Sequence, residues 1–300
     1  MSGKNTQFDE FIAGEVRKYK GIYVPVKSSV LRRIFIKKAA CAKLHPNPGD
    51  EFCVPGIGPN YEIVSNYEQE FRTSLRKSYM RAYTHADKHE PLIVERIRPD
   101  GYLILNGHHR WAAAVRSGLP ALPIKIVNLT QETDIRKMLQ TSRHNKRVTL
   151  DLDEVVFRAE NDGPLEKALS FPLNRVYRER LRLGVPALFR FLNMNGYDIW
   201  VYTARYYSFD YIRRLFKMHN AHVSGIVTGT ARKTQAGQEE RKAIETLIAN
   251  KYSVTVHIDN GTVLRIAGDT KTFEEYRLSG SAAGWSGEIM DVMEAWKTHE

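Results

Sequence analysis

Two aspartates at alternate positions end a short β-prone run in the middle of the chain. The run Val148–Leu150 leads into Asp151 and Asp153, after which the chain turns apolar at Val155 and Val156. Paired carboxylates repel each other unless a cation lies between them or one holds a proton. The pair therefore indicates metal binding or acid/base chemistry, with an ordinary strand end entering a polar turn as the alternative for this stretch alone.

Two later runs deliver more polar side chains. The strand predicted over 197–202 precedes Thr203, and the strand predicted over 254–258 precedes Asp259 and Asn260. Strands alternate with helices here, as a parallel sheet requires, and the carboxyl ends of such strands meet at one edge. Together these residues would suit phosphoryl transfer, which needs an attacking carboxylate, a proton-transferring carboxylate, a hydroxyl and acids that fix Mg²⁺.

In this order, the three motifs resemble those of the haloacid dehalogenase-like (HAD) phosphohydrolases. The resemblance implies a Rossmann-like three-layer α/β/α domain over residues 148–300 with a small cap insertion. It implies that Asp151 is the nucleophile, that Asp153 is the general acid/base and that Thr203 holds the phosphoryl group. The family's lysine would be Lys242, with Lys233 as the alternative.

The same resemblance implies a Mg²⁺ site. Asp151, the backbone carbonyl of Asp153 and Asp259 would bind the ion, and Asn260 stands where a second acid is common. An asparagine keeps an oxygen ligand but removes a charge, so we expect weaker metal binding.

In the first half, the most ordered part is a predicted hairpin followed by a glycine-containing loop. Two strands, over 91–97 and 102–105, lead into Asn106, Gly107, His108, His109 and Arg110, which open a helix that ends at Gly118. A third strand is predicted over 122–127. Backbone N–H groups, the helix dipole and side-chain donors at such a loop can bind a phosphate. The alternative is that the two histidines only cap the helix and pack.

The run 91–129, centred on this loop and preceded by His45-Pro46-Asn47-Pro48, resembles the ParB/sulfiredoxin-like domain. The resemblance covers residues 22–130 and implies a small α+β fold that binds a nucleoside triphosphate or a similar phosphate. Members of this kind act as DNA-partitioning nucleotide switches, sulfinic-acid reductases or small-molecule kinases.

The net positive charge of the chain belongs to its first half. Residues 1–147 hold 25 Lys and Arg against 14 Asp and Glu, whereas residues 148–300 hold 20 of each. We expect the first half to meet a polyanion, either a nucleic acid or a phosphorylated ligand, with a solvated basic surface as the alternative. Two cysteines, no apolar run of membrane length and no secretory signal pattern favour a reduced, cytoplasmic protein without membrane contact.

We therefore predict an α/β protein with a lead-in over 1–21, a nucleotide-binding domain over 22–130, a linker helix over 131–147 and a phosphatase domain over 148–300. The predicted function is Mg²⁺-dependent removal of phosphate from a nucleotide or a nucleic-acid end, with bifunctional kinase–phosphatase activity also open. The alternative is a nucleotide-controlled DNA-binding regulator with a vestigial phosphatase fold. Three arginines, Arg175, Arg178 and Arg205, are predicted to line an anionic substrate path, with plain surface charge as the alternative.

Overall fold

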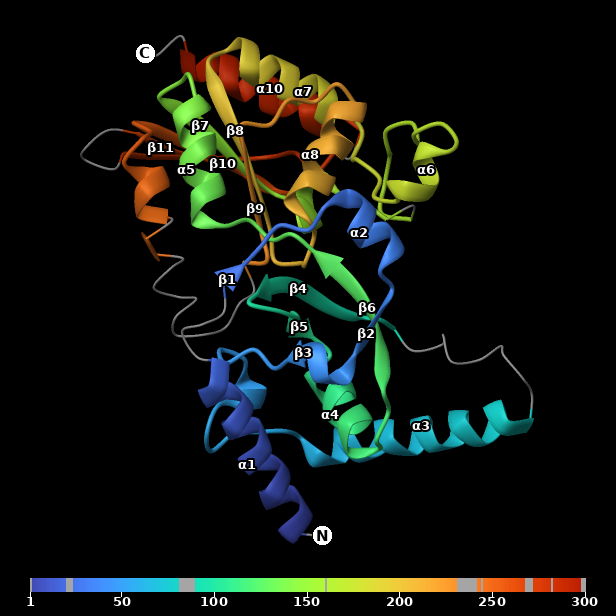
Figure 1. Cartoon of the computed structure of the whole chain (residues 1–300). Helices are drawn as coiled ribbons and strands as arrows, with labels where there is room; N and C mark the ends of the chain where they lie inside the picture. The colour runs from blue at the N-terminus through green and yellow to red at the C-terminus, as the bar shows by residue number, and fades with distance from the viewer. Residues whose placement is uncertain are drawn as a thin grey trace. The chain divides into compact units, whose positions relative to one another are not determined.

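The computed structural model describes residues 2–19, 24–80, 90–159, 161–230, 242–243, 245–267, 272–281 and 283–297 (Figure 1). These residues form a mixed α/β protein with two sheets. The described chain divides between Asn128 and Leu129 into two compact units. The predicted linker helix exists as α5 (Glu132–Thr141), but it packs on β9 (Gly225–Thr228) and so belongs to the second unit.

The first unit is built on a hairpin with a third strand beside it. β4 (Leu92–Arg98) and β5 (Tyr102–Asn106) pair antiparallel, and β6 (Ala121–Val127) pairs parallel to β4. These three strands confirm the predicted strand pattern. Shorter strands complete the sheet in the order β2-β6-β4-β5-β3, with β1 paired to β4. They are β1 (Val24–Pro25), β2 (Lys38–Ala40) and β3 (Leu44–His45).

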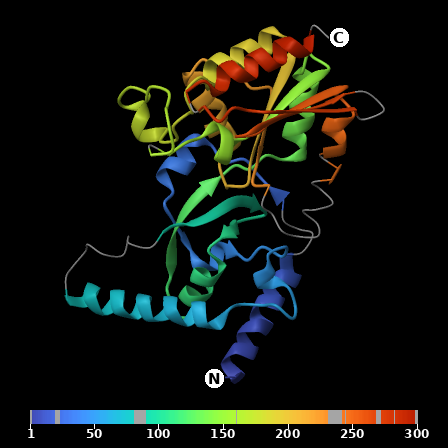
Figure 2. The ribbon, with the colours of Figure 1, turned by 180° about the vertical axis from the view of Figure 1, so that it is seen from behind.

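Helices complete the core of the first unit. α4 (His108–Arg116) connects β5 to β6 and buries Trp111 and three alanines, and α3 (Tyr61–Met80) packs against it. A short helix, α2 (Val30–Phe35), contacts β6. The predicted lead-in is a helix, α1 (Ser2–Tyr19), which Figure 2 shows at the N-terminus. Its Phe8 and Ile12 join the same core.

The second unit has a six-stranded sheet in the order β12-β11-β10-β7-β8-β9. Its four adjacent strands β10, β7, β8 and β9 are parallel, so their carboxyl ends meet at one edge. β11 and β12 extend the sheet by antiparallel pairing. The bounds are β7 (Lys146–Asp151), β8 (Tyr197–Thr203), β10 (Val254–Ile258), β11 (Thr262–Ala267) and β12 (Thr272–Arg277).

Strand side chains alternate between two layers of helices. One face of the sheet, including Val148 and Ile199, packs under α7 (Val185–Met194), α8 (Phe209–Met218) and α10 (Trp285–Lys297). The opposite face carries Trp200, which packs with residues of α5 and with Ile248 of the helical residues 245–249. The period of two along each strand produces this division, which gives three layers.

A small insertion leaves the sheet after β7. A π-helical turn (Leu152–Val156) follows the strand, and isolated bridges pair Phe157 with Leu181 and Leu165 with Arg182. The insertion contains one short helix, α6 (Leu173–Val176). The bridges hold its two ends together beside the turn.

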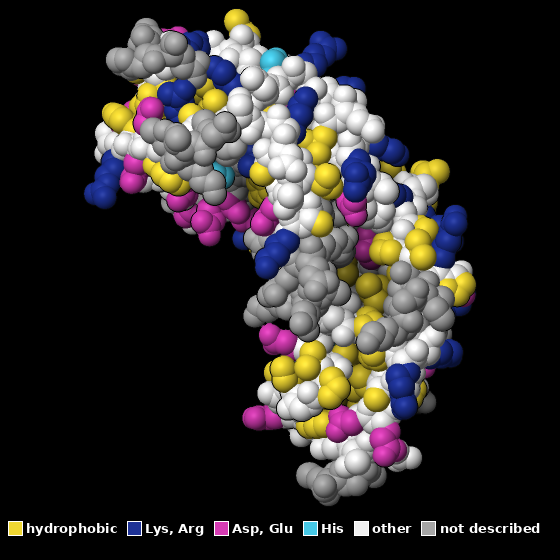
Figure 3. All heavy atoms as spheres, turned by 90° about the vertical axis from the view of Figure 1, so that its left-hand side faces the viewer, with side chains coloured by type: hydrophobic (Ala, Val, Ile, Leu, Met, Phe, Trp, Pro, Cys, Tyr) yellow, Lys and Arg dark blue, Asp and Glu magenta, His cyan; other side chains and the backbone are white. Residues whose placement is uncertain are grey.

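Two further features concern the apolar character of the helices and the distribution of charge on the surface. None of the helices in the described part of the chain combines the length and apolar character needed to cross a bilayer. On the face in Figure 3, Lys and Arg side chains are scattered among other types rather than gathered in one patch. That face therefore offers no continuous basic surface among the described residues.

Candidate functional site

The turn after β7 fixes the Asp151 carboxylate. Its Oδ1 accepts the backbone N–H of Asp153 at 2.7 Å and that of Glu154 at 2.9 Å. The turn thus presents two donors to one carboxylate oxygen, as a helix N-terminus does. The other oxygen of Asp151 is left for chemistry or for a cation.

Asp153 and Thr203 meet across the two central strands. Thr203 ends β8, is fully buried, and donates from Oγ1 to Asp153 Oδ2 at 2.7 Å. Arg205 follows Thr203 in the same loop. Its Nε forms an ion pair with Asp153 Oδ1 at 3.4 Å, and its backbone N–H donates to Thr203 Oγ1. The structure therefore brings Asp151, Asp153 and Thr203 to one sheet edge, and their catalytic roles stay predictions.

Asp259 and Asn260 follow β10 at the same edge but have different surroundings. Asp259 lines a cleft of about 600 Å³ together with Asp151. The Asn260 Oδ1 instead accepts from Arg158 at 2.5 Å and Arg182 at 3.1 Å. Its side-chain amide donates to the Glu154 carbonyl at 3.0 Å, so Asn260 connects the turn to both ends of the insertion.

The two arginines around Asn260 were not singled out as a pair from the sequence. Arg182 is buried, and its guanidinium lies 4.0 Å from the centre of the Trp285 ring. Burial, followed by the charge of Arg158, lowers the pKa of Arg182 to about 10. No local pattern marks this cluster, because its members are distant in sequence and the bridged insertion brings them together.

The predicted lysine has no established place in the site. Lys242 is exposed, and its backbone carbonyl accepts the Thr246 hydroxyl at 2.8 Å. Lys233 lies outside the described residues. Which lysine holds a phosphate therefore stays a prediction.

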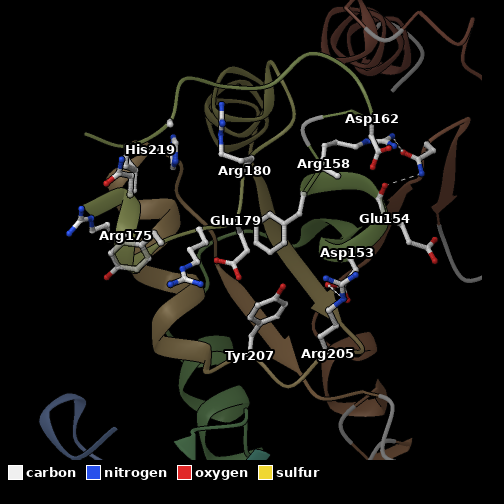
Figure 4. Close-up of a pocket in the computed structure, with 18 residues that line it drawn as sticks. Asp153, Glu154, Arg158, Asp162, Arg175, Glu179, Arg180, Arg205, Tyr207 and His219 are labelled. Carbon is white, nitrogen blue, oxygen red and sulfur yellow. Dashed lines mark hydrogen bonds and ion pairs between the residues drawn. The ribbon is translucent and has the colours of Figure 1, made fainter. Parts of the chain in front are cut away.

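A larger cleft of about 1040 Å³ opens on the other side of the turn, between Asp153 and the insertion (Figure 4). All three arginines predicted for a substrate path line it: Arg175, Arg178 and Arg205. Tyr207 and Phe157 line it as well, with their rings edge to face at 6.0 Å. The cleft combines guanidinium groups, aromatic rings and a carboxylate of the proposed catalytic pair.

The glycine loop of the first unit has a different geometry. Gly107 has φ of 102° and is the N-cap of α4. His108 Nε2 accepts the N–H of Asn47 at 3.2 Å, and His109 Nε2 accepts that of Asn60 at 3.1 Å. Both histidines therefore act as acceptors that hold neighbouring loops.

The other two side chains of this loop belong to Arg110 and Asn106, and they leave the backbone N–H groups as the donors at the N-terminus of α4. Arg110 is buried, and its guanidinium donates to the Glu90 carbonyl. Asn106 is exposed at the end of β5. The first N–H groups of an α-helix have no partner within the helix, so an anion here would meet the α4 backbone.

One family model matches part of the chain, from the first unit into the start of the second. Residues 61–143 match the family model of the ParB N-terminal domain, so this part of the chain is similar to that domain. The match includes α3, the hairpin, the glycine loop, β6 and α5. No curated protein matches the chain.

One solved structure is similar over part of the chain. It is the C-terminally truncated chromosome-partitioning protein ParB from Caulobacter crescentus, complexed with CTP-gamma-S. The two are 26% identical with a TM-score of 0.22, over 36% of this chain and 55% of that chain. This chain thus spans about half of that relative's length.

Proposed function

We propose that the second unit is a Mg²⁺-dependent phosphohydrolase of the HAD-like type with Asp151 as its nucleophile. The observation that carries the proposal is the meeting of Asp151, Asp153 and Thr203 at the ends of adjacent parallel strands. The parallel order β10-β7-β8-β9 and the tight turn after β7 also support it.

The residues divide the reaction between them. Asp151 attacks phosphorus with the oxygen that the turn leaves unbound, and Asp153 gives its proton to the leaving oxygen. Water then attacks the aspartyl-phosphate, Asp153 takes back a proton, and phosphate leaves with Asp151 restored. Thr203 orients Asp153 through its 2.7 Å hydrogen bond.

The donors at this edge fit a magnesium ion in part. Asp151 and Asp259 line one cleft, and carboxylate and carbonyl oxygens are the ligands that Mg²⁺ takes. Among the described residues, no three His, Cys, Asp or Glu side chains gather as a metal site, so the Asp153 carbonyl and waters would complete it. The ion would neutralise the phosphate charge. The Asn260 Oδ1 is left out of this ligand set because it accepts hydrogen bonds from Arg158 and Arg182.

Hydrolysis of para-nitrophenyl phosphate tests this proposal. We expect Mg²⁺-dependent turnover that Asp151→Asn abolishes and that Asp153→Asn lowers by about 10²–10⁴-fold. Asp291→Asn is the matched control and should keep its activity, because Asp291 is exposed on α10 and lines neither cleft. If no phosphate tested gives Mg²⁺-dependent turnover that requires Asp151, the enzyme proposal is wrong.

The family match favours a second candidate for the whole chain. A ParB-like, nucleotide-controlled DNA-binding regulator would need the first unit to bind a nucleotide and the second unit only to keep its fold. Its support is the match over residues 61–143, whereas the phosphatase proposal depends on residues that this match does not reach. Binding of nucleotide and DNA without turnover would favour this candidate.

Gly107→Ala tests nucleotide binding by the first unit. An added Cβ would lie 3.0 Å from Leu92 Cγ and 3.2 Å from Arg110 Nη2, at a φ that only glycine adopts readily. We expect calorimetric titration with ribonucleoside triphosphates to show affinity at least about tenfold weaker, a loss of about 1.4 kcal/mol. Gly118→Ala is the control, since its φ is +70° but its surroundings are open. Equal affinities in both variants would refute an anion site at this loop.

A further inference from the structure

The larger cleft of the second unit has room for more than a phosphate group. Its volume is about 1040 Å³, at the upper end of the range of small-molecule sites. Asp153 stands at one side of it, and Arg175 at the side away from Asp153 (Figure 4). A substrate that placed its reacting phosphate at Asp153 would still have most of the cleft to fill.

Two arginines of the insertion are available to bind an anion there. Arg175 and Arg178 are exposed and line the cleft. Among the described residues, neither guanidinium forms an ion pair with a carboxylate, and that of Arg175 lies 5.1 Å from the centre of the Phe171 ring. Two unneutralised guanidinium groups three residues apart suit a phosphate, which they can hold by charge-assisted hydrogen bonds.

The middle of the cleft suits an uncharged ring. Glu179 lies there, and the Tyr211 hydroxyl donates to it, so a second carboxylate or phosphate would be repelled at this point. Tyr207 is half-buried beside it, packed against Phe157 on one side and parallel to Tyr211 on the other. The exposed part of the Tyr207 ring lines the cleft, and nucleobases pack on aromatic side chains.

We propose that this cleft selects a phosphomonoester whose carrier bears a second phosphate. The scissile phosphate would lie at the turn, where Asp153 lines this cleft and Asp151 lines the smaller one, and the second phosphate would lie at Arg175 and Arg178. A nucleoside bisphosphate and the phosphorylated end of an oligonucleotide share this chemistry, with a nucleoside between the two phosphates. The proposal rests on the phosphohydrolase function and names its substrate class.

The test compares four substrates on the full chain with Mg²⁺. They are para-nitrophenyl phosphate, thymidine 3′-monophosphate, thymidine 3′,5′-bisphosphate and a 3′-phosphorylated oligothymidylate. We expect kcat/KM at least about tenfold higher for the bisphosphate or the oligonucleotide than for the monophosphate. An advantage shared by both identifies the second phosphate as the recognised feature, and one confined to the oligonucleotide identifies a nucleic-acid end.

The double variant Arg175→Gln with Arg178→Gln should remove that advantage. We expect KM for the preferred substrate to rise about tenfold or more while kcat and the turnover of para-nitrophenyl phosphate stay unchanged. Arg190→Gln is the control, because Arg190 is exposed on α7 and outside the cleft lining. Should the double variant lose turnover of para-nitrophenyl phosphate through misfolding, the two single variants replace it, with circular dichroism as the check on folding.

The outcomes separate the two proposals. No Asp151-dependent turnover of any substrate overturns the phosphohydrolase itself. Two results overturn only the substrate class while para-nitrophenyl phosphate is still turned over. One is equal kcat/KM for the monophosphate and the bisphosphate. The other is a higher kcat/KM for the bisphosphate or the oligonucleotide that persists in the Arg175→Gln, Arg178→Gln variant.

Discussion

His108 has a structural role in the glycine loop, and through it the stability of the first unit depends on pH. Its ring is buried and stacks on Phe52, and its Nε2 accepts the Asn47 N–H, which requires an unprotonated Nε2. Burial lowers the pKa of His108 from its ordinary 6.5 to about 4, His109 adds to the lowering, and Asp50 opposes it. Protonation therefore favours the unfolded chain.

The sign of the effect follows from proton linkage. Below about pH 6.5 the unfolded chain binds a proton at His108 that the folded chain refuses until about pH 4, so the free energy of unfolding falls as the pH falls. Between about pH 7 and pH 5 the loss from this one group is about 2 kcal/mol. Urea unfolding at the two pH values measures it.

His108→Gln should make the pH dependence of the first unit shallower. His109→Gln is the matched comparison, because burial lowers the pKa of His109 as well but its side chain is only half-buried. We expect the larger change in slope from His108→Gln. Equal slopes in the wild type and the His108 variant would contradict the assignment.

At the scale of elements, the strands and their ends were predictable from the sequence. Alternating apolar residues locate β7, β8 and β10, and counting residues places Asp151 and Thr203 at the ends of β7 and β8 and Asp259 just after β10. Parallel pairing then requires these residues to share one edge. The hairpin of β4 and β5 was predictable for the same reason, from two short runs around Pro99-Asp100-Gly101.

Contacts between distant residues could not be predicted in this way. Asn260 lies 78 residues from Arg182 and 102 from Arg158, and their meeting depends on how the insertion bridges Phe157 to Leu181. A sequence pattern fixes which face a side chain occupies but not which distant side chain it meets. The prediction that Asn260 binds the metal depends on its position in the sequence alone, whereas in the structure its Oδ1 accepts hydrogen bonds from two arginines.

The helix α1 shows a different limit. Its sequence is mainly polar, and among the side chains described for it only Phe8 and Ile12, four residues apart, are buried. Tyr61 donates its hydroxyl to the Asn5 carbonyl, and Arg116 lies 5.6 Å from the centre of the Phe8 ring. Such a narrow apolar stripe gives little periodic signal, so the tertiary contacts decide that this segment is helical.

For the whole molecule, the change in charge and the division in structure fall at different residues. The charge balance changes near residue 147, but the compact units divide after Asn128. Residues 1–128 hold 20 Lys and Arg against 12 Asp and Glu, so the first unit keeps most of the positive charge. α5 and the run into β7 carry the rest into the second unit, because α5 packs on β9.

The separate cores of the two units predict separate unfolding. The first core gathers residues of β4, β5, β6 and α4, and the second gathers residues of β7, β8, β10 and the helices around them, with no residue in common. Each unit should therefore unfold cooperatively by itself, and calorimetry should resolve two transitions.

Ile104→Ala and Ile199→Ala form a matched pair for this prediction. Both isoleucines are fully buried in strands, Ile104 in the first core and Ile199 in the second. Each substitution should cost about 2–5 kcal/mol through lost burial and the cavity that remains. We expect each to lower the temperature of one transition and leave the other within about a degree, because contacts that are not shared cannot couple the cores. A single transition that both variants lower equally would show that the units unfold as one.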